Sequence, residues 1–329
     1  MYEISPGLYY VIGIDLSRTH MKIMLMDLHL RPVEETRIQV SRESTPLFTL
    51  QFLEKSIRAM LTKHGLSTLQ LLGIGIGAVG PLKREEGMIL NPHNFPAAGW
   101  ENIPISQQLG EAFQTKVFLD NGANTAVLGE YRDGLWKEAA NVVYSIAGVG
   151  IRCGVMTHGQ VVRGSANREG AFGHMVVDVH GRKCTCGHYG CLEAYGTIPA
   201  IRNEIIRQLK RGARSLLSDI APDFEEMQFQ HICQAIGEGD ELSSQVVMDA
   251  GFHYGIGLSN MIHLIHPNMV ILGGALFTEL DMFYQAATDT ARQRCNLSAA
   301  NEVKFSRGSL GENAVAVGAG CMVIDYYLE

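Results

Sequence analysis

The chain has 329 residues, of which 46% are hydrophobic and 19% charged. This composition is typical of a globular protein with a sizeable core, and the length suffices for two domains. The formal net charge of −7 gives no electrostatic reason to expect nucleic-acid binding. No apolar run reaches transmembrane length, and the start "MYEISPGLYYVIGIDL" lacks a basic region and a cleavage site, which predicts a cytoplasmic protein with no membrane partner.

The first part of the chain alternates apolar runs with turns and one amphipathic pattern. The turn "SRTH" between two apolar runs predicts a β-hairpin, and the three-to-four spacing of leucines after it predicts a helix. The predicted elements, in chain order, are strands at 8–16, 21–28 and 36–40, a helix around 47–60, strands in "LLGIGIGAVGPL" and "KVFLDNGAN", and a helix over 121–130.

A second strand-rich part begins at "NVVYSIAGVGIRCGVMTHGQVV". Two similar halves, each with strands followed by helices, predict a two-lobed α/β protein. The predicted elements are an antiparallel pair at 141–147 and 151–156, a helix with apolar residues from 198 to 209, a helix over 241–266 that stops at a proline, a strand and helix around "NMVILGGALF", and a final helix at 314–327.

Between these strands and helices, three of the seven cysteines lie close together. They are Cys184, Cys186 and Cys191. In a reducing compartment such a cluster favours a metal over disulfides, and Zn²⁺ needs one further ligand beside three thiolates. His174 is the best candidate for the fourth ligand, and His180 and His188 are the alternatives. Four protein ligands leave no open position, so a structural role is expected.

Three turn segments follow strands in a characteristic order. They are "IDLSRTH", "IAGVGIRCG" and "ILGGALF", with the cysteine loop between the second and the third. Glycines at such turns let backbone N–H groups approach a phosphate closely. With "GHMVVDVHGRKCTCGHYGCLE", "LDNGANTAVLGE" and "GIGAVGPLKREEGMILNPHNFPAAGW", this order resembles the ROK family of repressors and sugar kinases over nearly the whole chain.

The resemblance implies an α/β fold of the two-lobed, actin-like ATPase type, with ribonuclease-H-like topology and a cleft between the lobes. Residues 1–120 with the C-terminal helix 312–329 would form one lobe, and 121–311 the other. It also implies a homodimer and, as ligands, a hexose or amino sugar, with ATP and Mg²⁺ in the kinases. A structural Zn²⁺, held by His174 and the three cysteines, would support the loop that presents sugar-binding residues.

The same resemblance assigns binding residues at positions that match the family's motifs. The residues expected at a sugar are Gly80, Asn94, Asn121, His174 and Glu193. The residues expected at a nucleotide are Asp15, Thr19, Gly148, Gly150, Gly273 and Gly274. Taken singly, the asparagines are better explained as caps of turns or helices, and Glu193 as a solvated residue in the first turn of a helix. Their combination favours a binding site.

The position of the family's catalytic base carries no carboxylate. The family places this aspartate in an N-D-A-N segment, and the segment here reads "NGAN", with Gly122 at the aspartate position. Asp120, two residues upstream, is a weak substitute because a displaced carboxylate loses the geometry that proton transfer needs. No catalytic residue is therefore expected.

The phosphate loops depart from the kinase pattern as well. The first, D-x-G-G-T in kinases, reads "DLSRT", so Ser17 and Arg18 stand at the glycine positions. The second, G-T-G-x-G in kinases, reads "GVGIR", where Val149 replaces a hydroxyl and Arg152 a glycine. On the sugar side, Ala171 replaces a glutamate that accepts hydrogen bonds from two sugar hydroxyls.

Three functions compete. A catalytically impaired, carbohydrate-responsive protein of the transcriptional-regulator type fits the lost base and the altered loops. Repressors of this family carry an N-terminal helix-turn-helix, and only about eight residues precede the first strand here, so this chain is expected to lack its own DNA-binding domain, whether it is a truncated piece or acts without one. The alternative is an ATP-dependent sugar kinase of the glucokinase or N-acetylmannosamine kinase type with an unusual base. Retention of Asn94, Asn121 and Glu193 argues against a third function, an interaction module without ligands.

Overall fold

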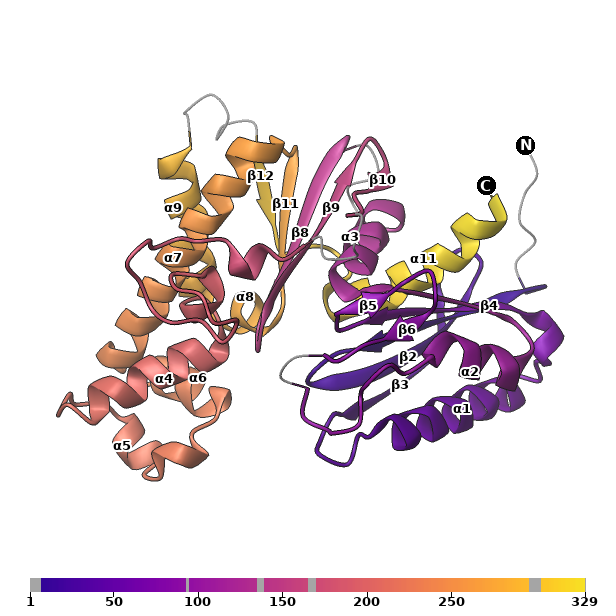
Figure 1. Ribbon diagram of the computed structural model, residues 1–329, viewed down its shortest axis with the longest axis horizontal. Helices are drawn as coiled ribbons and strands as arrows, with labels where there is room; N and C mark the ends of the chain where they lie inside the picture. Colours follow the sequence, from indigo (N-terminus) through magenta and orange to yellow (C-terminus); the bar gives the residue numbers. More distant parts are fainter. Residues whose placement is uncertain (1–6, 93–94, 135–138, 165–169, 296–302, 329) are drawn as a thin grey trace. The chain divides into compact units, whose positions relative to one another are not determined.

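The computed structural model describes the chain except for residues 1–6, 93–94, 135–138, 165–169, 296–302 and 329 (Figure 1). Packing divides the chain into two compact units. The first comprises Met1–Ala139, Gly154–Glu169 and Gly308–Glu329, and the second comprises Ala140–Cys153 and Gly170–Arg307. Among the described residues, no helix is both long enough and apolar enough to cross a membrane.

The first unit is built on a five-stranded sheet in the order β3-β2-β1-β4-β7. Strands β1 to β3 are antiparallel neighbours, whereas β4 and β7 continue the sheet in the direction of β1. The strands are β1 (Tyr10–Leu16), β2 (His20–Asp27), β3 (Pro32–Gln39), β4 (Leu71–Ala78) and β7 (Lys116–Asn121), and a small ribbon pairs β5 (Leu82–Lys83) with β6 (Met88–Ile89).

Helices cover both faces of this sheet (Figure 1). They are α1 (Pro46–Lys63) and α2 (Ile105–Phe113) on one face, and α3 (Gly122–Arg132) and α11 (Ala314–Leu328) on the other. Helix α11 lies directly on β1 and β4 because these strands carry glycine beneath it. A Cβ at Gly13 would lie 1.9 Å from the Ala316 oxygen, and one at Gly75 would lie 1.8 Å from the Ala319 oxygen. Short 3-10 turns, η1 (Thr68–Gln70) and η5 (Gly311–Asn313), precede β4 and α11.

Helix α3 packs with the first unit, whereas the lobes predicted from the family resemblance assign residue 121 onward to the other lobe. The reason is close contact between α3 and α11. A Cβ at Gly129 would lie 2.6 Å from the Ala314 oxygen, and one at Gly318 would lie 1.6 Å from the Thr125 oxygen. The two helices therefore form one layer of the same unit.

The second sheet has the order β10-β9-β8-β11-β12. Its strands are β8 (Asn141–Ala147), β9 (Ile151–Thr157), β10 (Gln160–Val161), β11 (Met269–Gly273) and β12 (Lys304–Ser306). The helices of this part are α4 (Ile198–Leu209), α5 (Leu217–Ile220), α6 (Phe229–Gly237), α7 (Glu241–Ile265), α8 (Ala275–Glu279) and α9 (Asp281–Arg294), with 3-10 turns η2 (Phe172–His174), η3 (Leu192–Ala194) and η4 (Phe224–Glu226).

Helix α7 forms the centre of the second unit. Tyr254 on this helix is fully buried, and its hydroxyl lies 2.7 Å from the Ser145 hydroxyl on β8. Buried tyrosines need such a partner for the phenol group. Two glycines on α7 face α9, and a Cβ would lie 2.8 Å from the Ala286 Cβ at Gly251 and 2.5 Å from the Ala287 oxygen at Gly255, so the two helices pack closely.

The predicted elements differ from the structure mainly at their ends. The strand expected at 36–40 is β3, which begins earlier, at Pro32. Its first residues are charged, as is common in an edge strand, so a search for apolar runs does not detect them. Glu193 lies in the first turn of a helix, as one interpretation of the sequence has it, but this helix is a short 3-10 helix, η3. The next α-helix begins only at Ile198.

Candidate functional site

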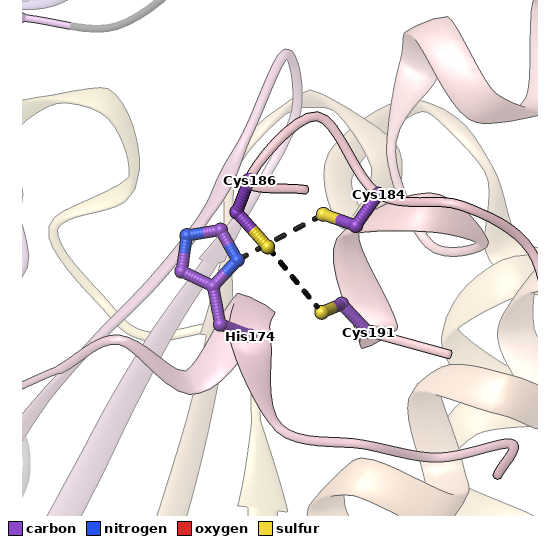
Figure 2. Close-up of side chains that lie close together, drawn as sticks. All are labelled: His174, Cys184, Cys186 and Cys191. Atoms are coloured by element: carbon purple, nitrogen blue, oxygen red, sulfur yellow. Dashed lines mark hydrogen bonds between the residues drawn. The ribbon is translucent and has the colours of Figure 1, made fainter. Parts of the chain in front are cut away.

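Four potential metal ligands come together in the second unit. The ligand atoms of His174, Cys184, Cys186 and Cys191 all lie within 4.8 Å of one another (Figure 2). The sulfurs of Cys186 and Cys191 are 3.7 Å apart, and His174 Nδ1 lies 3.9 Å from the Cys184 sulfur. Tetrahedral coordination with Zn–S bonds of ~2.3 Å places two sulfurs about 3.8 Å apart. The donor set and its spacing therefore fit a zinc ion.

The alternative histidines lie outside this group of four. His188 Nδ1 lies 3.6 Å from the Cys186 sulfur, and the His188 carbonyl oxygen accepts a hydrogen bond of 2.8 Å from the Cys184 N–H. The backbone N–H of His188 lowers the pKa of the Cys186 thiol to about 7, whereas burial raises the pKa of Cys191 to about 12. The Cys186 thiol thus ionises more readily than the Cys191 thiol, and binding of a metal ion would release protons from these thiols.

The loop that carries these ligands is anchored on the helices of the same unit. The Tyr195 hydroxyl donates a hydrogen bond of 2.9 Å to Asp178 and accepts one of 2.7 Å from the Arg182 backbone. Its ring stacks on His253 of α7, with centroids 4.2 Å apart. Burial raises the pKa of Tyr195, so the phenol keeps its proton and remains a donor to Asp178. These contacts hold both ends of the loop.

Glu193 lies two residues after the candidate metal-binding loop (residues 174–191). Its side chain reaches the second glycine loop, which is the turn between β8 and β9 (residues 148–152). Its Oε2 accepts a hydrogen bond of 3.3 Å from the Ile151 backbone N–H. Ala171, at the position of the family's glutamate, is exposed just before η2. The second unit therefore brings Glu193 near the turn at Gly148 and Gly150.

Packing explains the paired glycines after β11 without a ligand. A Cβ at Gly273 would lie 2.3 Å from the Tyr144 hydroxyl, and one at Gly274 would lie 2.4 Å from the Ala147 oxygen. Gly274 also has a φ of +91°, which disfavours other residues. These glycines are required by the fold whether or not a nucleotide binds.

In the first unit, the segment that holds the family's base is rigid and polar. Asn121 is the N-cap of α3 and accepts a hydrogen bond of 2.9 Å from the Ala123 N–H. Asp120 is buried, accepts a hydrogen bond of 2.9 Å from the Asn124 amide and forms a 2.8 Å ion pair with Arg163. This carboxylate is neutralised and held in place, which makes it unsuited to the role of a displaced base.

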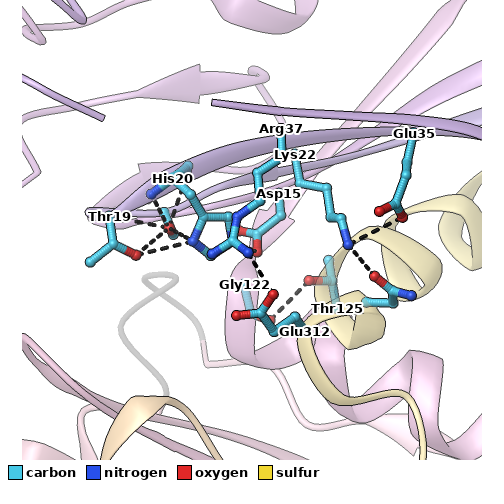
Figure 3. Close-up of polar contacts among 11 residues, drawn as sticks. Asp15, Thr19, His20, Lys22, Glu35, Arg37, Gly122, Thr125 and Glu312 are labelled. Carbon is cyan, nitrogen blue, oxygen red and sulfur yellow. Dashed lines mark hydrogen bonds and ion pairs between the residues drawn. The ribbon is translucent and has the colours of Figure 1, made fainter. Parts of the chain in front are cut away.

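The first phosphate loop satisfies its own backbone groups. The Ser17 hydroxyl accepts hydrogen bonds from the N–H groups of Thr19 (3.3 Å) and His20 (3.0 Å). His20 Nε2 lies 3.0 Å from Asp15, which is only 6% exposed (Figure 3). The N–H groups of Ser17, Thr19 and His20 are thus occupied within the loop itself, and Asp15 is paired with a histidine.

One of the remaining predicted residues, Gly80, has little structural support as a ligand. Gly80 ends the turn after β4, where a Cβ would meet its nearest atom, the Leu82 nitrogen, at 3.6 Å. Nothing in this spacing requires glycine at the position. Asn94 lies outside the described residues.

Sequence reasoning missed three residues that shape these sites: Arg163, His20 and Tyr195. Arg163 pairs with a carboxylate 43 positions earlier, so no local pattern could reveal it. His20 lies only five residues from Asp15. Because side chains alternate between the two faces of a strand, the predicted hairpin could have indicated that these two residues share a face. Tyr195 lies four residues after Cys191, and only the fold shows that it braces the loop.

The sequence profile of the ROK family matches residues 11–326. The chain belongs to the ROK family. Among its relatives, the xylose repressor of Caldicellulosiruptor bescii is 27% identical over 334 residues, which covers 100% of this chain and 82% of the repressor. The glucokinase of Thermotoga maritima is 34% identical over 206 residues, which covers 62% of this chain and 63% of the kinase. Both branches of the ROK family, regulators and kinases, are therefore represented.

Solved ROK structures have the same fold. The hexokinase from Thermus thermophilus superposes with a TM-score of 0.79 at 26% identity and covers 97% of this chain and 98% of its own. A transcriptional regulator described as a homolog of the E. coli MLC protein has a TM-score of 0.81 at 23% identity, with 98% and 79% covered, and shows the fold alone. The expected α/β fold of the two-lobed, actin-like ATPase type is confirmed.

Proposed function

We propose that this ROK protein is a carbohydrate-responsive, regulator-like protein that binds a sugar and does not phosphorylate it. The observation that carries the proposal is the base segment. Gly122 begins α3 where a kinase needs a carboxylate, and the neighbouring Asp120 is paired with Arg163. Without a base, proton removal from the sugar hydroxyl loses ~10²–10⁴-fold in rate. The relatives named xylose repressor and N-acetylglucosamine repressor support the regulatory assignment.

The sugar is a neutral hexose, pentose or amino sugar, contacted by Gly80, Asn94, Asn121, His174 and Glu193. Hydroxyl groups suit this set because it offers amide, imidazole and carboxylate partners. Ala171 removes one bidentate acceptor, so modest affinity is expected. The active species is a homodimer, as the family resemblance implies.

The metal in the second unit is a structural Zn²⁺ bound by His174, Cys184, Cys186 and Cys191. The donor set of three sulfurs and one nitrogen supports this identity. When bound, zinc supplies cross-linking and no chemistry on the sugar, because its four positions are filled by protein. The chain's own residues then orient His174 and Glu193 toward the sugar.

One experiment separates this function from the kinase alternative. Purified protein is titrated by calorimetry with D-xylose, D-glucose, N-acetylglucosamine and N-acetylmannosamine, and ADP release is measured with ATP and Mg²⁺ for each sugar. We expect saturable binding of at least one sugar and no sugar-dependent ADP release. Turnover at ~1–100 s⁻¹, the ordinary kinase range, would establish the kinase instead. Absence of binding at millimolar sugar would favour a module that has lost its ligands.

A further inference from the structure

The second glycine loop, at the turn between β8 and β9, is held on both sides by one segment of the chain. That segment, residues 193–198, follows the metal-binding loop. The Ile198 N–H donates a hydrogen bond of 2.9 Å to the Gly148 carbonyl oxygen. The Ile151 N–H donates one of 3.3 Å to Glu193 Oε2. One carboxylate and one backbone N–H thus define the two ends of the turn.

The same segment is tied to the metal ligands. The Leu192 N–H donates a hydrogen bond of 2.9 Å to the Met175 carbonyl oxygen. Leu192 directly follows Cys191, and Met175 directly follows His174, so this bond joins η3 to η2 beside two of the four ligands. A bound ion would hold η2 and η3 in place through His174 and Cys191. The hydrogen bond between Leu192 and Met175 would then restrict the position of the neighbouring Glu193.

Glu193 has little freedom to move away from Ile151. A Cβ at Gly173 would lie 3.2 Å from Glu193 Oε2 and 3.0 Å from the Ile151 Cβ. The backbone of η3 is also braced, because the Thr197 hydroxyl donates a hydrogen bond of 3.0 Å to the Glu193 carbonyl oxygen and accepts one from Ala200 as the cap of α4. The carboxylate is therefore confined between η2 and the start of β9.

We infer that Glu193 is a positioning residue through which the metal-binding loop orders the second glycine loop. In this chain the loop needs no nucleotide to be ordered, because Glu193 and Ile198 occupy its hydrogen-bonding groups at Ile151 and Gly148. Loss of the ion, or movement of Glu193 when a sugar engages it, releases the Ile151 N–H and loosens the turn. The inference rests on the zinc site proposed above, and it adds one effect of that site, the ordering of the second glycine loop.

The test is hydrogen exchange at the Ile151 amide, followed by mass spectrometry on peptides that span residues 148–152. The samples are zinc-loaded protein, protein treated with a zinc chelator, and zinc-loaded Glu193→Ala and Glu193→Gln. Glu226→Gln, an exposed carboxylate in the same unit, is the matched control. Zinc content is measured first, and peptides from α7 report whether the unit as a whole has stayed folded.

We expect Glu193→Ala to accelerate exchange at Ile151 by about tenfold, the size that one charge-assisted hydrogen bond supplies, with α7 unchanged. Glu193→Gln keeps an acceptor and should lie between that variant and the unaltered protein. Chelation should accelerate exchange in the unaltered protein and add little in Glu193→Ala, because the two perturbations remove one connection.

Two results would overturn the inference. One is unchanged exchange at residues 148–152 after chelation, although the loop at 175–191 becomes disordered. The other is an equal response of Glu226→Gln and both Glu193 variants. A protein that contains no zinc would contradict the metal proposal, and the Glu193 variants would then still test the hydrogen bond alone. None of these readings depends on sugar binding or kinase activity, so failure here is distinct from failure of the proposed function.

Discussion

Gly122 stands at the position of the family's catalytic base, and the local geometry leaves room for the missing side chain. Gly122 is the first residue of α3, after the cap Asn121. A Cβ there would meet its nearest atom, the Ala78 oxygen, at 3.8 Å, which is ordinary van der Waals contact. The absence of a base is therefore a property of the sequence and is not imposed by packing.

The variant Gly122→Asp should fold, with a free energy of unfolding equal to or ~0.3–1 kcal/mol above that of the unaltered protein. Glycine in a helix costs conformational entropy, and a carboxylate in the first turn interacts favourably with the helix dipole. Urea denaturation measures this, with Gly122→Asn as the uncharged control.

The same variant should show little or no sugar-dependent ADP release. The first phosphate loop remains closed by Ser17, and Arg18 and Arg152 remain at glycine positions. Adding Ser17→Gly, Arg18→Gly and Arg152→Gly gives a better chance of turnover, because proton removal and phosphate binding are separate requirements. Kinase-level turnover by Gly122→Asp alone would show that the loops are not a barrier.

At the scale of elements, the packing of α7 on α9 depends on the absence of side chains. A Cβ at Gly255 would lie 2.5 Å from both the Ala287 oxygen and the Thr290 Cβ. Neither atom is the end of a flexible chain, so the helices would have to separate.

We expect Gly255→Ala to lower the free energy of unfolding by about 1–3 kcal/mol, the usual cost of overpacking. Gly237→Ala is the control, because nothing lies within 4 Å of a Cβ at that position at the end of α6. Alanine there should be neutral or slightly stabilising. Equal melting temperatures for the two variants would contradict the packing argument.

The proposed metal-binding loop has little regular structure of its own, so we expect its order to depend on the proposed ion and on the anchor at Tyr195. Replacing Cys186 by Ser should reduce bound zinc well below one equivalent per chain and lower the melting temperature. Sugar binding should weaken as well, because His174 and Glu193 flank the loop. Elemental analysis and thermal denaturation measure the first two effects.

The control for the loop variant is Cys233→Ser, a partly exposed thiol on α6 outside the group of four. It should keep its zinc and its melting temperature. Full zinc content in Cys186→Ser, or freely titratable thiols in the unaltered protein, would rule out the proposed ligand set.

For the whole molecule, ligand binding should appear as stabilisation. A sugar present at 100 times its dissociation constant raises the free energy of unfolding by ~2.7 kcal/mol, provided that it binds only the folded protein. We expect such an increase for a sugar of the panel, and none for ATP with Mg²⁺, because Ser17 and His20 fill the first phosphate loop. Thermal denaturation checks both. A larger shift with ATP than with any sugar would point back to a kinase.

The sequence by itself determined the family, the position of the candidate metal site and the absence of the catalytic base. These features depend on residues close together in the chain, such as the spacing C-x-C-x4-C and the segment "NGAN". Turn chemistry and ligand spacing act over a few residues, so they can be read without a fold. The same holds for the apolar periodicity that predicts α7.

Only the tertiary structure decided what the retained polar residues contact. Arg163 pairs with Asp120 across 43 positions, and Glu193 binds the Ile151 N–H across 42. Which partner a buried carboxylate finds depends on how strands and turns are stacked, because desolvated charges take whichever donor the fold brings within reach. The sequence predicted Asp120 as a weak substitute base and Glu193 as a sugar ligand. In the fold, Asp120 forms an ion pair with Arg163, and Glu193 accepts a hydrogen bond from the second glycine loop.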